Sequence, residues 1–204
     1  MKQKIQIRCK NNKKSQKVEI GSTLFDVFSS FDLKMTHGPV SARVNNKVEG
    51  MHYRVYNSKD VEFLDMNSAS GSRAYTRTLF FVLCKAVQDI YPNTDVVIDI
   101  PVSNGFYVDI RLGRPVVDED VNILRRRMQE IIDSKMPIRR FTVPTEEAIA
   151  LFQEKGDVEK VKLLRTSGSI YTTYYKIGEN VDYYYGTLLT NTSQLYLFGL
   201  EKYY

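Results

Sequence analysis

The chain has 204 residues, of which 43% are hydrophobic and 26% charged, with 14 Tyr, 10 Phe and a formal net charge of +5. This composition can fill a hydrophobic core and excludes a disordered chain, and no stretch approaches the ~20 consecutive apolar residues of a membrane helix. Because the first residues lack an apolar core followed by a cleavage site, we expect no secretory signal, no membrane contact and a cytoplasmic location. Cys9 and Cys84 are far apart and outside any CxxC spacing, which favours two reduced, buried thiols.

The positive charge is concentrated near the N-terminus. Residues 1–64 carry 12 Lys and Arg against 6 Asp and Glu, whereas residues 65–204 carry 17 against 18. Seven basic residues and no acidic residue lie within residues 1–17. Such an arm can contact the phosphates of RNA or another polyanion, or it can be an edge hairpin that lysines keep solvated. The sequence leaves both alternatives open.

The first 64 residues predict a small sheet with one helix. In the first strand polar and apolar residues alternate, so that Ile5 and Ile7 share one face. Ser22 or Thr23 can cap the helix. The predicted elements, in chain order, are strands at 2–8 and 16–20 around a turn at 11–13, a short helix that opens within 21–28, and strands at 40–44 and 60–64. This order outlines a ubiquitin-like β-grasp domain.

A small polar linker, residues 65–71, is the predicted domain boundary. A long helix follows it, with Ser72 as a candidate N-cap. Its predicted buried face recurs with the 3.6-residue helical period and consists of Leu79, Val82, Leu83, Ala86, Val87 and Ile90. Arg73 and Arg77 stand four residues apart in the first turns, so both side chains project from one face of this helix.

The rest of the chain alternates between strand and helix patterns. We expect a strand at 96–102, a turn at 103–105, a return strand at 106–110, helices starting near 118, 145 and 157, and β-like segments at 169–177 and 181–186. The helix near 118 has a predicted buried stripe of Val121, Leu124, Met128, Ile131 and Ile132. Its triple arginine, residues 125–127, is expected on the solvated side. The fold class is α+β.

Two groups of short motifs carry a family resemblance. The segments EIGSTL (19–24), SARVNNKV (41–48) and DVEFL (60–64) resemble a TGS domain, the β-grasp module named for threonyl-tRNA synthetase, GTPase and SpoT proteins. The second group consists of PVSNGFYVD (101–109), Glu119-Asp120-Val121 with Arg127-Met128, and Val181-Asp182 ahead of Gly186. It resembles the second additional domain of threonyl-tRNA synthetase, the editing-domain fold. The resemblance implies a TGS-like domain at 1–64 and a degenerate editing-like α+β domain with an antiparallel sheet at 72–204.

In that editing family, an HxxxH on the central helix and a later CxxxH form the metal-binding or editing cluster. Carried onto this chain, the four positions hold Arg73, Arg77, Tyr184 and Leu188. An arginine has no free lone pair, a leucine has no donor atom, and a tyrosine phenol is rarely a zinc ligand. The resemblance therefore implies a domain without a metal and without catalytic residues.

Other cleft positions of the family correspond to Lys160, Asp182 and the aromatic Tyr107. We therefore expect a cationic pocket that binds a phosphate or carboxylate and is lined by Arg73, Arg77, Tyr107, Lys160, Asp182 and Tyr184. In the alternative, the two arginines pair with Asp182 or another carboxylate and fill an inactive site.

A TGS domain followed by a degenerate editing-like domain, without a synthetase core, resembles the N-terminal region of bacterial uridine (nucleoside) kinases. The chain contains no GxxxxGK[ST] motif, so we expect a P-loop kinase domain to follow in cis and to bind the ATP and magnesium. On this hypothesis the chain is a non-catalytic binding or regulatory region with a nucleotide or RNA ligand. The alternatives are an RNA- or tRNA-binding module and a stand-alone tRNA-editing-like protein.

Overall fold

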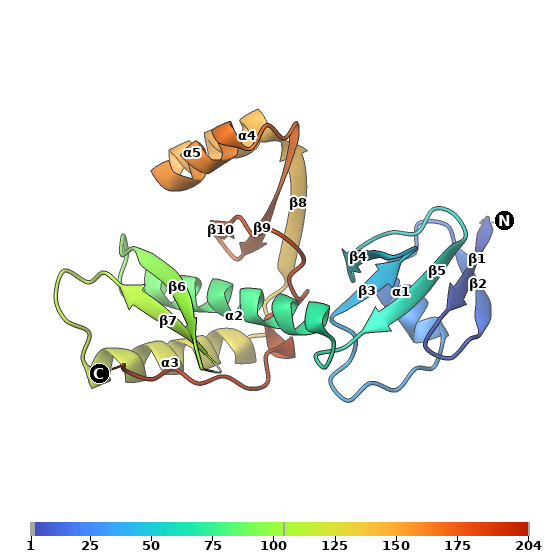
Figure 1. The fold of residues 1–204 in the computed structure, drawn as a ribbon, viewed down its shortest axis with the longest axis horizontal. Helices are drawn as coiled ribbons and strands as arrows, with labels where there is room; N and C mark the ends of the chain where they lie inside the picture. The colour runs from blue at the N-terminus through green and yellow to red at the C-terminus, as the bar shows by residue number, and fades with distance from the viewer. Residues whose placement is uncertain (1–2, 104, 204) are drawn as a thin grey trace. The chain divides into compact units, whose positions relative to one another are not determined.

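The computed structural model describes residues 3–103 and 105–203 (Figure 1). The elements are β1 (Lys4–Cys9), β2 (Ser15–Glu19), α1 (Leu24–Ser30), β3 (Ser41–Val44), β4 (Lys47–Gly50), β5 (Lys59–Leu64), α2 (Ala69–Ile90), β6 (Val96–Val102), β7 (Gly105–Ile110), α3 (Asp118–Asp133), β8 (Ile138–Pro144), α4 (Thr145–Glu154), α5 (Val158–Thr166), β9 (Tyr171–Ile177), β10 (Asn180–Asp182) and the 3₁₀ turn η1 (Thr192–Gln194). Helices combine with largely antiparallel sheets, which confirms the predicted α+β class.

The chain divides into two compact units. The larger unit consists of Met1–Met136 and Thr187–Tyr204, and the smaller unit is the contiguous segment Pro137–Gly186. The domain boundary predicted at residues 65–71 rests on composition and on the family resemblance, and it stays a prediction.

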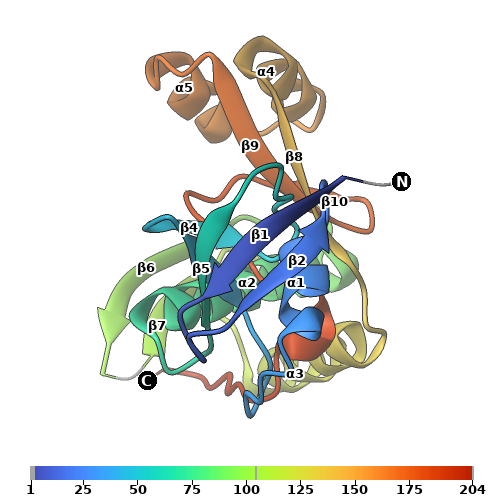
Figure 2. The same ribbon diagram turned by 90° about the vertical axis from the view of Figure 1, so that its right-hand side faces the viewer.

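The first sheet of the larger unit has the order β2-β1-β5-β3-β4, with β1 and β5 parallel and the other pairs antiparallel (Figure 1, Figure 2). Helix α1 packs its buried residues Leu24 and Val27 into the same core as Ile7 and Phe63 of the sheet. A crossing helix over a mixed sheet of this order is the β-grasp arrangement. Position 2 of the predicted first strand lies outside the described residues.

Strand β4 was not among the predicted elements. Asn45 and Asn46 have φ values of 45° and 73°, and they form a two-residue turn that pairs β3 with β4. Asparagine tolerates the positive φ that such hairpins require. The strand is only four residues long and carries the charged residue Glu49 at a buried position. Its sequence therefore lacks the alternation of polar and apolar residues that predicts a strand.

Helix α2 begins at Ala69, earlier than predicted, and its cap is Ser68 rather than Ser72. The Oγ of Ser68 accepts a hydrogen bond from the amide of Gly71 at 3.0 Å. A Cβ atom at Gly71 would lie 1.8 Å from the carbonyl oxygen of Asp65 and 2.8 Å from a methyl group of Val40. Gly71 is therefore a close-packing position inside the helix and not a linker residue.

The buried face of α2 agrees with the predicted helical period in its second half. Val82, Leu83, Ala86 and Val87 are buried, whereas Leu79 and Ile90 are only partly buried. In the first half the buried positions are small or hydrogen-bonded polar residues: Gly71, Ala74, Tyr75 and Thr78. Hydropathy alone does not identify such positions. Glycine and alanine give a weak hydrophobic signal, and the hydroxyl groups of Tyr75 and Thr78 are buried only because they find hydrogen-bond partners inside the fold.

Strands β6 and β7 form a two-stranded ribbon in the larger unit, and Phe106 of β7 packs edge-to-face on Phe80 of α2 with 5.0 Å between ring centroids. The predicted turn includes Asn104, which lies outside the described residues; its neighbour Ser103 has a φ of 52°. The five residues of the stripe predicted on α3 are all buried, which confirms its amphipathic pattern. Of the triple arginine, Arg127 forms an ion pair with Asp89 of α2 at 2.9 Å.

Asp120 fixes the beginning of α3. Its carboxylate accepts hydrogen bonds from both terminal guanidinium nitrogens of Arg114 at 2.7 Å. It also accepts hydrogen bonds from the Tyr91 hydroxyl at 2.7 Å and from the Val117 amide at 2.9 Å. The side chain of Asp120 is only 4% exposed. These hydrogen bonds, the one from Arg114 first, hold the pKa of Asp120 well below its ordinary value because all of them favour the charged form.

The C-terminal segment returns to the larger unit and is held by side chains of α2. The Tyr75 hydroxyl donates to the Leu197 carbonyl at 2.6 Å and accepts the amides of Tyr196 and Leu197. Burial raises the pKa of Tyr75, so it stays protonated and can donate. Nearer the start of the segment, the Thr192 hydroxyl accepts a hydrogen bond from the Met136 amide at 2.9 Å.

The smaller unit packs helices α4 and α5 against a three-stranded antiparallel sheet of order β10-β9-β8 (Figure 1). Its core consists of Ala148, Ile149, Phe152, Val161 and Leu164, against which Val143, Tyr174, Val181 and Tyr183 pack. Strand β8 was missed because its sequence, IRRFTVP, has adjacent arginines and a proline and shows no alternation. The β-like pattern predicted at 181–186 continues as a strand only to Asp182.

Candidate functional site

Arg73 and Arg77 lie one turn apart on α2, as predicted. Arg73 is exposed and donates to the Ser70 hydroxyl at 3.3 Å, while Arg77 is partly buried. Each side chain ends in a guanidinium group and brings a positive charge to this face of α2.

The two later positions of the family cluster fall in different units. Tyr184 belongs to the smaller unit and is partly buried, and Leu188 belongs to the larger unit and is 2% exposed. Next to it, the amide of Leu189 donates to the Thr78 hydroxyl of α2 at 2.9 Å. The position where the resemblance implies a histidine thus carries an aliphatic side chain that fills the core.

Lys160 and Asp182, both predicted pocket residues, lie in direct contact in the smaller unit. The Lys160 ammonium is 2.9 Å from Asp182 and 2.6 Å from Asp157, and it also lies 5.8 Å from the centre of the Phe152 ring. Burial alone opposes the charged form, but the two carboxylates outweigh burial and raise the pKa of Lys160 above its ordinary value. Asp157 also caps α5 by accepting the Lys160 amide at 3.0 Å.

This cluster of Lys160, Asp157 and Asp182 binds β10 to the start of α5. Two carboxylates already surround the one ammonium group, so the cluster offers no net positive charge to an anionic ligand. The sequence indicated Lys160 and Asp182 through the family resemblance, but it gave no sign of Asp157, whose role depends on the start of α5.

The remaining predicted residue, Tyr107, lies on β7 with 40% of its surface exposed and contacts Tyr203 edge-to-face at 5.9 Å. Arg73, Arg77 and Tyr107 belong to the larger unit, and Lys160, Asp182 and Tyr184 to the smaller one. That all six line one cationic pocket stays a prediction.

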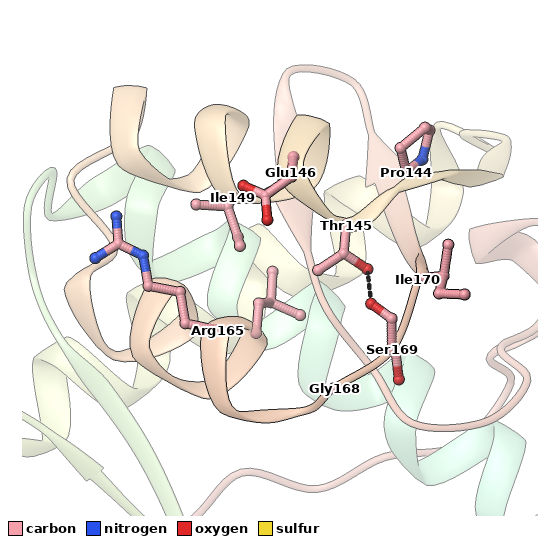
Figure 3. Close-up of a pocket in the computed structure, with 9 residues that line it drawn as sticks. Pro144, Thr145, Glu146, Ile149, Arg165, Gly168, Ser169 and Ile170 are labelled. Atoms are coloured by element: carbon pink, nitrogen blue, oxygen red, sulfur yellow. Dashed lines mark hydrogen bonds between the residues drawn. The ribbon is translucent and has the colours of Figure 1, made fainter.

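A pocket of about 440 Å³ lies within the smaller unit (Figure 3). It is lined by Pro144, Thr145, Glu146, Ile149, Leu164, Arg165, Gly168, Ser169 and Ile170. The Thr145 hydroxyl closes one side by donating to the Ser169 carbonyl at 2.6 Å, and Glu146 and Arg165 carry opposite charges from α4 and α5 (Figure 3). None of the predicted site residues lines this pocket, and no sequence motif marked it.

The described residues contain no group of three or more His, Cys, Asp or Glu side chains arranged to hold a metal ion. Cys9 is buried and Cys84 partly buried, and no disulfide joins the two. No helix in the described part of the chain combines the length and the apolar character that a membrane span requires.

Comparison with curated proteins shows that the chain is similar to part of a tRNA synthetase. No protein-family model matches the chain. The threonine–tRNA ligase of Acetivibrio thermocellus is 30% identical over 181 residues, which cover 88% of this chain and 28% of the ligase. The ligase of Clostridium kluyveri is 28% identical over 192 residues, or 93% of this chain and 30% of the ligase. The ligase of Marinobacter nauticus is 26% identical over 181 residues, which cover 88% of this chain and 28% of the ligase.

The chain therefore spans less than a third of the length of these curated relatives. The comparisons support the resemblance to threonyl-tRNA synthetase, which extends over both units. They give no support to the uridine-kinase parent, which remains a hypothesis.

Proposed function

We propose that this chain is a tRNA-binding module that has lost the hydrolytic chemistry of an editing domain. The observation that carries the proposal is its similarity to threonine–tRNA ligases along 88% of its length. Proteins with that name act on tRNA, and a shared sequence over both units favours a shared RNA partner.

The side chains at the cluster positions support the loss of hydrolysis. A metal-activated water needs nitrogen, oxygen or sulfur ligands, and neither the guanidinium groups of Arg73 and Arg77 nor the buried Leu188 can supply them. The two arginines instead provide charge, which suits a phosphate or carboxylate better than a metal ion.

The test measures binding and hydrolysis on the same protein preparation. We expect the full chain to retain an in-vitro-transcribed threonine tRNA in a filter-binding assay and to leave a mischarged tRNA intact in a deacylation assay. Arg73→Ala/Arg77→Ala is expected to weaken tRNA binding if these arginines contact RNA, and the pair Arg126→Ala/Lys162→Ala, exposed elsewhere, serves as the charge-matched control. Absence of tRNA binding would refute the proposal, and turnover of the mischarged tRNA would refute the loss of hydrolysis.

A second candidate function, the regulatory region of a uridine-kinase-like enzyme, is favoured by the substitution of all four cluster positions. A domain that only regulates a kinase has no need of hydrolytic residues. On this hypothesis the ATP and magnesium sites belong to a P-loop domain encoded downstream of Tyr204. Sequencing that region tests it: a GxxxxGK[ST] motif supports a kinase parent, and a synthetase core or a stop codon contradicts it.

A further inference from the structure

The N-terminal hairpin gathers six exposed cations on one small element, which we call the basic hairpin: Lys4, Arg8, Lys10, Lys13, Lys14 and Lys17. Strands β1 and β2, drawn in shades of blue in Figure 2, are its two arms, and β2 is one of the two edge strands of the sheet. Ile7, Cys9 and Val18 are buried beneath it. The alternation of the strands therefore commits one face to the core and leaves the other to the cations.

The register of the strands sets the positions of these cations. Lys4 and Arg8 lie on the outward face of β1, four residues and therefore about 13 Å apart. Lys17 pairs with Gln6, which lies between them. Lys10, Lys13 and Lys14 extend this positive surface around the turn. The acidic neighbours by register are Glu19, opposite Lys4, and Asp60, beside Arg8 on β5.

None of the six forms an ion pair with another residue among those described. Elsewhere in the larger unit, by contrast, cations such as Arg43 and Arg114 are each paired with a carboxylate. Six unpaired positive charges on one hairpin repel one another, and a polyanion relieves that repulsion.

The turn that carries three of the lysines is held firmly by the rest of the fold. The Asn11 amide group donates to the Phe63 carbonyl at 2.9 Å and accepts the Phe63 amide at 2.8 Å. The Asn12 side chain donates to the Phe31 carbonyl at 3.3 Å. A preformed turn loses little conformational entropy when a partner binds, which favours affinity.

Lys13 occupies the turn at a position that suits glycine. Its φ of 59° lies in the left-handed region, where an L-residue with a Cβ is disfavoured by about 1 kcal/mol or more. A lysine at such a position costs stability, and it adds a positive charge at the tip. Strain of this kind is often retained where a side chain has a function.

We infer that the basic hairpin is the surface that binds the phosphate backbone of RNA. This inference rests on the proposed tRNA-binding function and names the surface that carries it. The hairpin has no aromatic residue to stack on bases, so its contacts are with phosphates and are independent of sequence. Binding then depends steeply on salt, because each lysine–phosphate contact releases counterions.

The experiment compares three triple variants of the full chain, each with three fewer positive charges, for binding to the threonine tRNA transcript at several salt concentrations. The tip variant is Lys10→Gln/Lys13→Gln/Lys14→Gln, and the face variant is Lys4→Gln/Arg8→Gln/Lys17→Gln. The control variant, Lys34→Gln/Arg126→Gln/Lys162→Gln, changes exposed cations outside the hairpin. Circular dichroism establishes that each variant is folded.

We expect the tip or the face variant to raise the Kd about tenfold or more near physiological salt. The slope of log K against log salt should also fall by about 2 to 3, one unit or slightly less for each lost phosphate contact. The control variant should bind like the wild type. If the wild type binds tRNA but all three variants bind equally well with the same slope, the hairpin is not the contact surface and the tRNA-binding function still stands. If the wild type does not bind, both proposals are wrong.

Discussion

The basic hairpin and the cluster around Lys160 place lysines in opposite situations. In the hairpin, six cations share a surface with few carboxylates and have no ion-pair partner among the described residues. In the smaller unit, the ammonium of one lysine lies within 3 Å of both Asp157 and Asp182, and 29% of that lysine side chain is exposed.

This difference shows that a charged residue's role depends on its partners rather than on its type. A paired and partly buried lysine stabilises the fold. Removing either member of the pair lowers the free energy of unfolding, because the other charge is then buried without a partner. An unpaired surface lysine contributes little to stability and remains available for a ligand. We therefore expect mutations of paired charges to change the free energy of unfolding, and mutations of hairpin charges to change binding.

The largest expected effect on stability is that of Asp120→Asn. The carboxylate accepts four hydrogen bonds, three of them from the side chains of Arg114 and Tyr91. Losing its charge should lower the free energy of unfolding by about 2 kcal/mol, as for other charged hydrogen bonds. Urea denaturation at pH 7 measures the loss, and Asp118→Asn, at an exposed position of the same first turn, is the control.

The same residue predicts a pH dependence. Since the folded pKa of Asp120 lies below its unfolded value near 3.9, its stabilisation is present above about pH 5 and is lost as the pH falls toward the folded pKa. Between about pH 5 and 3, wild-type stability should fall more steeply than that of Asp120→Asn. Parallel curves for the two proteins would contradict the role given to this carboxylate.

A smaller loss is expected for Lys160→Met. The substitution keeps the aliphatic packing but leaves Asp157 and Asp182 facing each other without a cation. Because the ammonium is still partly exposed, we expect a loss of about 1 to 2 kcal/mol. Lys162→Met, on the same helix but exposed, should change the free energy of unfolding by less than about 0.5 kcal/mol. Equal effects of the two substitutions would show that the ion pairs do not matter.

The smallest expected effect has the opposite sign. Lys13→Gly should raise the free energy of unfolding by up to about 1 kcal/mol, because glycine accepts the positive φ without strain. Lys14→Gly removes the same charge where φ is not positive and should be neutral or destabilising. A gain in stability together with weaker tRNA binding would separate the two contributions of Lys13; unchanged binding would count against the hairpin.

The sequence predicted elements whose pattern is set locally. The buried stripe on α3 and the start of β6 follow from the spacing of apolar residues along the sequence, and tertiary packing does not change either of them. It misplaced the start of α2, because Ser68 and Ser72 are equally good caps and only the packing of Gly71 against Asp65 decides between them. It missed β8 because that strand pairs with β9, 30 or so residues away, and carries its arginines on exposed positions.

The site was less predictable than the fold. Family resemblance indicated Lys160 and Asp182 but not that Asp157 would join them, since an N-cap geometry depends on where α5 begins. The pocket beside Thr145 had no signature, because its polar and apolar lining residues come from segments 20 residues or so apart and form no recognisable motif. The charge of the hairpin was evident from composition, whereas its lack of ion pairs required the structure.

The return of the C-terminal segment to the larger unit has a consequence for the order in which the protein matures on the ribosome. Residues that anchor this segment, such as Tyr75 and Thr78, are synthesised long before their partners Leu197 and Leu189. The smaller unit is contiguous, and all of it is synthesised after residues 1–136 but before residues 187–204 of the larger unit. Vectorial synthesis therefore lets the inserted unit finish folding while the larger unit, which contains most of the chain, still waits for its last residues.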